Sequence, residues 1–156
     1  EIARGLANFL PTKMRMNVLR LPGDVTVLND AYNANPQSMR AAATVLRDVP
    51  GARKVAVVGD MMELGDNSQQ FHYAVGECFG ELGADCVIAV GQLAAAIAEG
   101  AREGGVARVL HFESLEEAMG TICGCLAPGT VILVKASRAM HFEKIVIALA
   151  DAANRA

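Results

Sequence analysis

The chain has 156 residues, a formal net charge of −3 and 53% hydrophobic residues. This apolar content with so little net charge excludes a disordered chain, and the length suits one domain that buries its core without a metal or disulfide staple. The mild acidity and the lack of any Lys/Arg cluster argue against nucleic acid or an anionic membrane as the main partner.

The first 22 residues differ from the rest of the chain. They open Glu-Ile-Ala-Arg, without an initiator Met and without the basic-then-apolar pattern of a signal peptide, so we expect a piece of a longer protein. Met14, Met16 and Val18 alternate with Arg15, Asn17 and Leu19, which predicts an edge strand. We therefore divide the chain into a lead-in segment, 1–22, from a junction with a preceding domain, and a main domain, 23–156.

Short apolar runs alternate with longer helical segments after Gly23. The runs are rich in Val, Ile and Leu and bounded by Gly, Pro or Asp, which is typical of strands. They lack strict alternation, which favours strands buried on both faces of a parallel sheet. The predicted strands are Val25–Asn29, Lys54–Val58, Cys86–Val90, Arg108–Phe112 and Val131–Val134.

Five segments with helical periodicity lie between and after these strands: Pro36–Arg47, Ser68–Leu82, Leu93–Glu103, Leu115–Leu126 and Ala139–Ala153. In the first, Asn35 before Pro36 is a predicted N-cap. Ser114 and Glu117 have the spacing of a capping box at the fourth. One face of the first helix is predicted to carry its apolar residues, Met39, Ala42, Ala43 and Leu46.

This alternation predicts an α/β fold: a three-layer, Rossmann-like, open and mostly parallel sheet of about six strands with helices on both faces. In such sheets ligands bind beyond the carboxyl ends of the strands, where the strand order reverses. The loops after the strands are therefore the places to look for function.

The loop after the first strand is the most polar. Asp30 at a strand end can accept two hydrogen bonds from ribose hydroxyls, and Asn33 and Asn35 precede a helix N-terminus that favours an anion. A plain turn and helix cap explains the same residues.

The loop after the last strand brings two cations and a hydroxyl, Lys135, Ser137 and Arg138, to the predicted start of the final helix. Cations there are unfavourable without an anion, so the group predicts a phosphate or carboxylate site. A solvated charge pair is the alternative.

The remaining polar residues give weaker signals. Asp60 and Glu63 follow the second strand and could orient an amine or a metal-bound water, or simply cap a helix. The three histidines are scattered without partners at ligand spacing, and the four cysteines suit free thiols in a reducing compartment. The chain has no GxxxxGK[ST] phosphate loop and no GxGxxG after the first strand, so groups that cradle a triphosphate are expected elsewhere.

Three ordered motifs span most of the chain: Asp30-Ala-Tyr-Asn-Ala-Asn-Pro-Gln-Ser-Met-Arg40, Val58-Gly-Asp-Met-Met-Glu-Leu-Gly65, and Val134-Lys-Ala-Ser-Arg-Ala-Met140 with Glu143 following. With them the sequence resembles the C-terminal domain of the Mur ligases, in the branch that joins D-Ala-D-Ala to UDP-MurNAc-tripeptide. Related ligases usually carry His in place of the Tyr-Asn-Ala-Asn run.

The resemblance implies part of an ATP-dependent ligase of bacterial peptidoglycan synthesis that activates a carboxylate as an acyl phosphate. It implies a domain that is inactive alone, closes over ATP and brings the dipeptide. N-terminal and central domains of the same protein would hold the UDP end, the phosphate loop and the Mg²⁺ ligands. It also implies a cytoplasmic enzyme, and we expect a monomer with no membrane span and no nucleic-acid partner.

The resemblance assigns roles to particular residues, with none catalytic and none binding metal in this domain. The family pattern usually has Gly where this chain has Ala136, which would strain the loop if that position needs a positive φ. Arg15 follows Met14 where the family has Gly. The implied ATP-binding residues are Arg15, Asp30, Tyr32 and Asn33, and the implied substrate-binding residues are Asn35, Asp60, Lys135, Ser137 and Arg138.

Two other interpretations stay open. One is a related amide ligase similar to folylpolyglutamate synthase, against which the Asn-Ala-Asn loop without His argues. The other is a nucleotide- or anion-binding module without catalysis.

Overall fold

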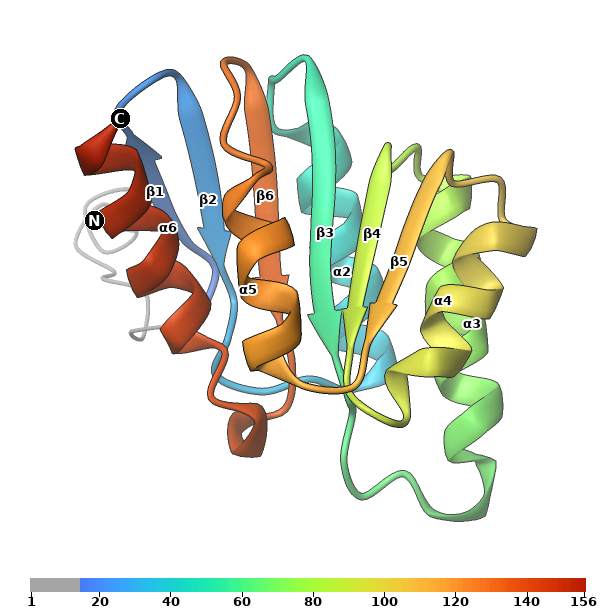
Figure 1. Ribbon diagram of the computed structural model, residues 1–156. Coiled ribbons are helices and arrows are strands. Elements are labelled where there is room, and N and C mark those ends of the chain that lie inside the picture. The colour runs from blue at the N-terminus through green and yellow to red at the C-terminus, as the bar shows by residue number, and fades with distance from the viewer. Residues whose placement is uncertain (1–14) are drawn as a thin grey trace, which may run out of the picture.

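Five parallel strands and one antiparallel edge strand form a single sheet (Figure 1). The computed structural model describes residues 15–156. The sheet order is β1-β2-β6-β3-β4-β5, and β1 runs antiparallel to β2. The strands are β1 (Asn17–Leu21), β2 (Val25–Asn29), β3 (Arg53–Gly59), β4 (Cys86–Val90), β5 (Arg108–Phe112) and β6 (Thr130–Lys135).

All five parallel strands were predicted from their apolar runs, and β3 and β6 each extend one residue further at both ends. The predicted edge strand is also confirmed as β1, which pairs Asn17 with Asn29 and Leu21 with Val25. Met14, which the alternation included, lies outside the described residues. The expected α/β class with a mostly parallel open sheet is therefore correct.

Helices cover both faces of the sheet, as Figure 1 shows. On one face lie α2, α3 and α4, and on the other α5 and α6, each over its own apolar cluster. The helices are α2 (Pro36–Asp48), α3 (Ser68–Glu81), α4 (Ala94–Glu103), α5 (Leu115–Cys123) and α6 (Glu143–Arg155). No helix among residues 15–156 is long and apolar enough to cross a membrane.

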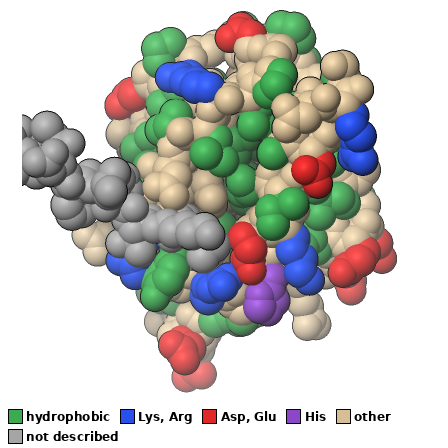
Figure 2. All heavy atoms as spheres, turned by 90° about the vertical axis from the view of Figure 1, so that its left-hand side faces the viewer, with side chains coloured by type: hydrophobic (Ala, Val, Ile, Leu, Met, Phe, Trp, Pro, Cys, Tyr) green, Lys and Arg blue, Asp and Glu red, His purple; other side chains and the backbone are tan. Residues whose placement is uncertain are grey.

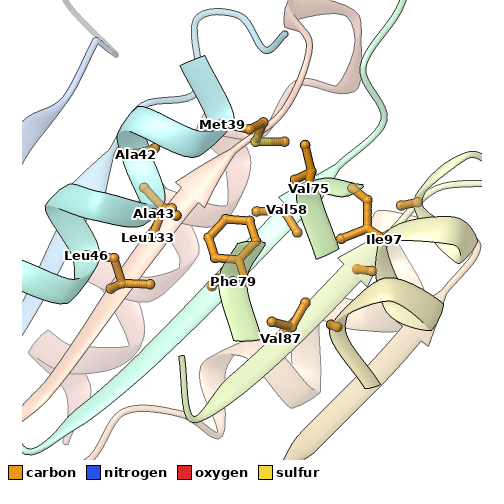
Figure 3. Close-up of a cluster of buried hydrophobic side chains, with 14 of the residues drawn as sticks. Met39, Ala42, Ala43, Leu46, Val58, Val75, Phe79, Val87, Ile97 and Leu133 are labelled. Atoms are coloured by element: carbon orange, nitrogen blue, oxygen red, sulfur yellow. The ribbon is translucent and has the colours of Figure 1, made fainter. Parts of the chain in front are cut away.

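The predicted face of α2 is the buried one. Met39, Ala42, Ala43 and Leu46 are at most 2% exposed. Figure 3 shows them facing the sheet and the neighbouring helices α3 and α4. Asn35 caps the helix, because its side chain accepts from the Ser38 N–H and the Ser38 hydroxyl accepts from the Asn35 N–H. Ser114 likewise caps α5 by accepting from the Glu117 N–H.

The start of the last helix was predicted wrongly. A 3₁₀ turn, η2 (Arg138–Met140), follows β6, and α6 begins only at Glu143. His141 between them adopts a left-handed backbone with φ of 55°, which no α-helix can continue through. Arg138 therefore lies in a turn and not at the N-terminus of α6.

The position of β6 decides where a ligand can bind. β6 lies between β2 and β3, and its chain continues into α6 on one face, while β2 and β3 continue into α2 and α3 on the other. Chains that leave neighbouring strands in opposite directions open a crevice between them. The fold thus provides two crevices, one on each side of the carboxyl end of β6.

Candidate functional site

Each crevice beside β6 contains a hollow. The β2–β6 hollow has a volume of about 420 Å³ and is lined by Arg15, Met16, Asp30, Tyr32, Asn33, Asn35, Ser38, Ala41, Ala42, Val45 and Lys135. The β3–β6 hollow has a volume of about 400 Å³ and is lined by Asn33, Ala34, Asn35, Met62, Glu63, Leu64, Ser137, Arg138 and Ala139. Asn33 and Asn35 belong to both, so the two hollows adjoin.

A buried ion pair forms the floor of the β2–β6 hollow. Lys135 Nζ lies 2.7 Å from Asp30 Oδ2 and donates to the Asn33 carbonyl oxygen at 2.8 Å. The Lys135 side chain is 3% exposed and that of Asp30 15%. Asp30 Oδ1 also accepts from the Met16 N–H at 3.0 Å. Because a carboxylate offers about four acceptor positions, roughly two remain for a ligand.

Arg15 and Tyr32 stand together at the rim of this hollow. The Arg15 guanidinium lies 4.1 Å from the centroid of the Tyr32 ring, a cation–π contact between two exposed side chains. A planar guanidinium over an aromatic ring gives the hollow one flat, positively charged wall.

The sequence position of Asn35 left two interpretations open, a helix cap and an anion-binding group, and the structure is compatible with both. The side-chain oxygen of Asn35 is engaged with the Ser38 N–H at 2.8 Å, so the cap is real. Asn35 nevertheless lines both hollows, and the N–H₂ of its side chain is a donor suited to an anion. Asn33 is exposed beside it and is fixed through its carbonyl oxygen by Lys135.

The loop after β6 is split between the two hollows. Ser137 and Arg138 line the β3–β6 hollow, whereas Lys135 lines only the β2–β6 hollow. The three side chains thus line two adjoining hollows and do not form one cluster. The Lys135 side chain is held toward the loop after β2 by Asp30, because a buried ammonium needs a paired carboxylate.

Ser137 is anchored through two hydrogen bonds to the loop after β3. Its N–H donates to the Asp60 carbonyl oxygen at 3.0 Å, and its Oγ accepts from the Met62 N–H at 2.8 Å. Since the hydroxyl oxygen already accepts, its own proton is available to the hollow. Ala136 before it does not adopt a positive φ, so the strain considered for Ala at this position does not arise.

Arg138 reaches the hollow while paired to the start of α6. Its Nη1 lies 2.8 Å from Glu143 Oε2, and its side chain is 48% exposed. Burial opposes the charge on Glu143, but hydrogen bonds from Arg138 and His141 outweigh it and lower the pKa of the Glu143 carboxyl. The remaining guanidinium N–H groups are the donors that a carboxylate or phosphate would use.

Asp60 does not line either hollow, contrary to its predicted substrate-binding role. Its carboxylate is buried, with Oδ1 accepting from the Ala94 N–H at 2.8 Å at the start of α4. Gly91 leaves room for it, since a Cβ there would lie 2.6 Å from the Asp60 Cγ. The capping alternative therefore describes Asp60, and its carbonyl oxygen positions Ser137.

Substitutions at Asp60 should separate its charge from its hydrogen bond. Asp60→Ala leaves the buried Ala94 N–H without an acceptor, so the free energy of unfolding should fall by about 1–3 kcal/mol. Asp60→Asn keeps an oxygen acceptor and removes a buried charge, so at pH 7 it should be at least as stable as the natural chain. Urea denaturation of the three chains measures both.

The difference in unfolding free energy between Asp60→Asn and the natural chain should change with pH in one direction. Burial raises the pKa of the Asp60 carboxyl above its ordinary value, so the folded chain holds a proton that the unfolded chain releases. Stability is thus lost as pH rises from the unfolded to the folded pKa. The advantage of Asp60→Asn should be absent at about pH 3 and grow above about pH 4, the ordinary carboxyl range; an advantage that shrinks with rising pH contradicts it.

His72, His111 and the four cysteines are all at least partly buried. His72 is fully buried with both ring nitrogens hydrogen-bonded, and His111 Nε2 lies 2.8 Å from the Gly91 carbonyl oxygen. All four cysteines are free thiols, as predicted, and burial raises the pKa of each. Within residues 15–156 no three His, Cys, Asp or Glu side chains cluster as metal ligands would.

Sequence reasoning considered Glu63 in the loop after β3 but missed its neighbours Met62 and Leu64. These residues form a wall of the β3–β6 hollow. Their position after a strand was a usable signal; Met61 beside them is fully buried, whereas Met62 is exposed. Figure 2 shows the β1 side of the molecule. Lys/Arg, Asp/Glu and His side chains gather low on this face, toward the end of the sheet at which the parallel strands end.

Comparison with known proteins places these features in one family. The family model described as "Mur ligase, glutamate ligase domain" matches residues 14–138. The UDP-N-acetylmuramoyl-tripeptide–D-alanyl-D-alanine ligase of Bacillus subtilis is 36% identical over 94% of this chain and 32% of its own length. The Escherichia coli ligase of the same name is 38% identical over 96% of this chain and 32% of its own. The chain thus spans about a third of these relatives.

Solved structures of relatives have the same fold as this chain. A crystal structure of MurF from Acinetobacter baumannii superposes with a TM-score of 0.85 at 36% identity, over 96% of this chain and 33% of that one. MurF ligase from Thermotoga maritima, solved in complex with ADP, gives a TM-score of 0.79 at 26% identity over 99% of this chain and 36% of that one.

Proposed function

Because this chain belongs to the Mur ligase family, we propose that it is the C-terminal part of an ATP-dependent ligase that joins D-alanyl-D-alanine to UDP-N-acetylmuramoyl-tripeptide. The observation that carries the proposal is the pair of adjoining hollows on either side of β6, one lined by Asp30 and Lys135 and the other by Ser137 and Arg138. Two adjoining binding sites are what a ligase needs to bring a nucleotide and an incoming amine together.

The β2–β6 hollow fits the ribose and base side of ATP. Asp30 has acceptor positions left for ribose hydroxyls after binding Lys135 and Met16. Arg15 and Tyr32 provide a flat cationic wall, and Asn33 lies where the hollow meets its neighbour. The ADP complex of the Thermotoga relative supports a nucleotide in this family.

The β3–β6 hollow fits the incoming dipeptide. Arg138 and the Ser137 hydroxyl are donors suited to its carboxylate, and the Asn35 amide lies between this hollow and the nucleotide side. This arrangement would hold the dipeptide with its amine directed toward the acyl phosphate that ATP forms on the tripeptide.

The remaining machinery belongs to the parts of the relatives that this chain does not span. We propose that residues 23–156 are the closing domain and residues 1–22 its connection to a central domain that supplies the phosphate loop and the Mg²⁺ ligands. Closure of the domain would exclude water, which would otherwise hydrolyse the acyl phosphate. We further propose a monomeric enzyme of the bacterial cytoplasm.

Phosphate release by the full-length enzyme tests this proposal. With ATP and Mg²⁺ present, we expect release only when UDP-MurNAc-tripeptide and D-Ala-D-Ala are supplied together. Release that is unchanged without D-Ala-D-Ala contradicts the proposed second substrate. Release with a pteroate and glutamate instead would favour the folylpolyglutamate synthase-like alternative, and nucleotide binding without release in any mixture would favour the binding module.

A further inference from the structure

The backbone of the loop after β3 is fixed by side chains from two other elements. The Met61 N–H donates to His72 Nε2 of α3 at 2.9 Å, and the next N–H, of Met62, donates to Ser137 Oγ at 2.8 Å. Ser137 in turn donates its N–H to the Asp60 carbonyl oxygen. Within this short stretch the loop is therefore held between α3 and the loop after β6.

The hydrogen bonds of His72 define its protonation state. Nδ1 lies 2.7 Å from the Ser68 carbonyl oxygen, which only accepts, so Nδ1 carries the proton. Nε2 is then the bare nitrogen that accepts from Met61. The ring is fully buried, so neither bond can be replaced by water without moving the loop.

We propose that His72 is a positioning residue for the second-substrate site. By holding Met61, it sets where Met62, Glu63 and Leu64 form the wall of the β3–β6 hollow. Through the Met62–Ser137 bond it also sets the direction of the Ser137 hydroxyl. The β2–β6 hollow contains no residue of this loop, so nucleotide binding is not affected by His72. This inference rests on the proposed function of the β3–β6 hollow.

Two amide substitutions in the full-length enzyme separate the two bonds of His72. Gln places its oxygen near the position of Nε2 and can keep the Met61 bond, whereas Asn reaches only the position of Nδ1 and loses it. We expect His72→Asn to raise the KM for D-Ala-D-Ala about tenfold, with the KM for ATP within about twofold of the natural enzyme. His72→Gln should restore the KM for D-Ala-D-Ala to within about threefold of the natural value.

His111→Asn is the matched control, because His111 also binds a backbone carbonyl but lines neither hollow. It should lower the melting temperature by less than His72→Asn, because His111 is only partly buried and makes one hydrogen bond, and it should leave both KM values unchanged. Equal increases in both KM values for His72→Asn, or no increase in either, would overturn the proposal. If His72→Asn does not fold, a tenfold increase in the KM for D-Ala-D-Ala in His72→Gln would also overturn the proposal.

Amide hydrogen exchange on the full-length protein tests the positioning without relying on activity. Exchange across residues 61–64 should be faster in His72→Asn than in His72→Gln, even if D-Ala-D-Ala proves not to be the substrate. Equal exchange in the two variants contradicts the positioning role. If the enzyme does not turn over D-Ala-D-Ala but the two variants differ in exchange as expected, only the proposed substrate is contradicted.

Discussion

Replacing Gly100 by Ala should destabilise the fold by about 3 kcal/mol or more, because two helices meet there backbone to backbone. A Cβ on Gly100 would lie 2.9 Å from the Tyr73 carbonyl carbon and closer still to its oxygen. Gly76 on α3 has the reciprocal contact, with the Ala101 nitrogen at 2.6 Å from its added Cβ. Backbone atoms cannot rotate away, so α3 and α4 must separate and open the core between them. Urea denaturation measures the loss.

Gly120→Ala is the control for this prediction. Gly120 also lies inside a helix, α5, but an added Cβ meets no atom within 4 Å. Ala should therefore stabilise α5 by about 0.5–1 kcal/mol through helix propensity alone. A loss at Gly100 no larger than the effect at Gly120 would show that α3 and α4 are not packed as described.

Lys135→Met should lower the free energy of unfolding by about 3 kcal/mol and weaken nucleotide binding by the full-length enzyme. The substitution keeps most of the buried side chain but leaves Asp30 largely buried without its cation, and it frees the Asn33 carbonyl oxygen. We expect a loss of unfolding free energy at the lower end of the usual range for breaking a buried ion pair, because the Asp30 carboxylate lies in an open hollow and can regain water. Denaturation and the KM for ATP are the measurements.

The double variant Asp30→Asn with Lys135→Met distinguishes charge from packing. It removes both charges together, so it should recover at least half of the stability lost in Lys135→Met while leaving nucleotide binding impaired. Arg47→Met is a surface control, since the Arg47–Asp48 pair is exposed and should contribute little. A double variant as unstable as the single would show that the Asp30–Lys135 pair is not the cause.

Local periodicity was enough to predict most elements of the fold. The run Val25–Asn29 is buried throughout, as its continuous apolar sequence indicated, because it lies between two strands and beneath helices on both faces. The α2 cap at Asn35 and the apolar face of α2 depend on contacts three or four residues apart, which a sequence displays directly. The start of α6 was missed because nothing in the sequence signals a left-handed His141.

The candidate site was predictable only in part. Asp30, Asn33, Ser137 and Arg138 were predicted because strand ends in parallel sheets lie at one edge; all four line the hollows, and their binding roles stay predictions. The direction of Lys135 and the burial of Asp60 were not found, since each depends on a partner far along the chain: Asp30 and Ala94.

The sequence by itself determined which segments become strands and helices, which loops are polar, and through its motifs the family. Only the tertiary structure decided that β6 lies between β2 and β3, and so that two hollows adjoin at Asn33 and Asn35. It also decided that His72 and Ser137 hold one loop between them. The physical reason is that strand order and buried pairing depend on contacts between residues distant in sequence, whereas periodicity and capping depend on neighbours.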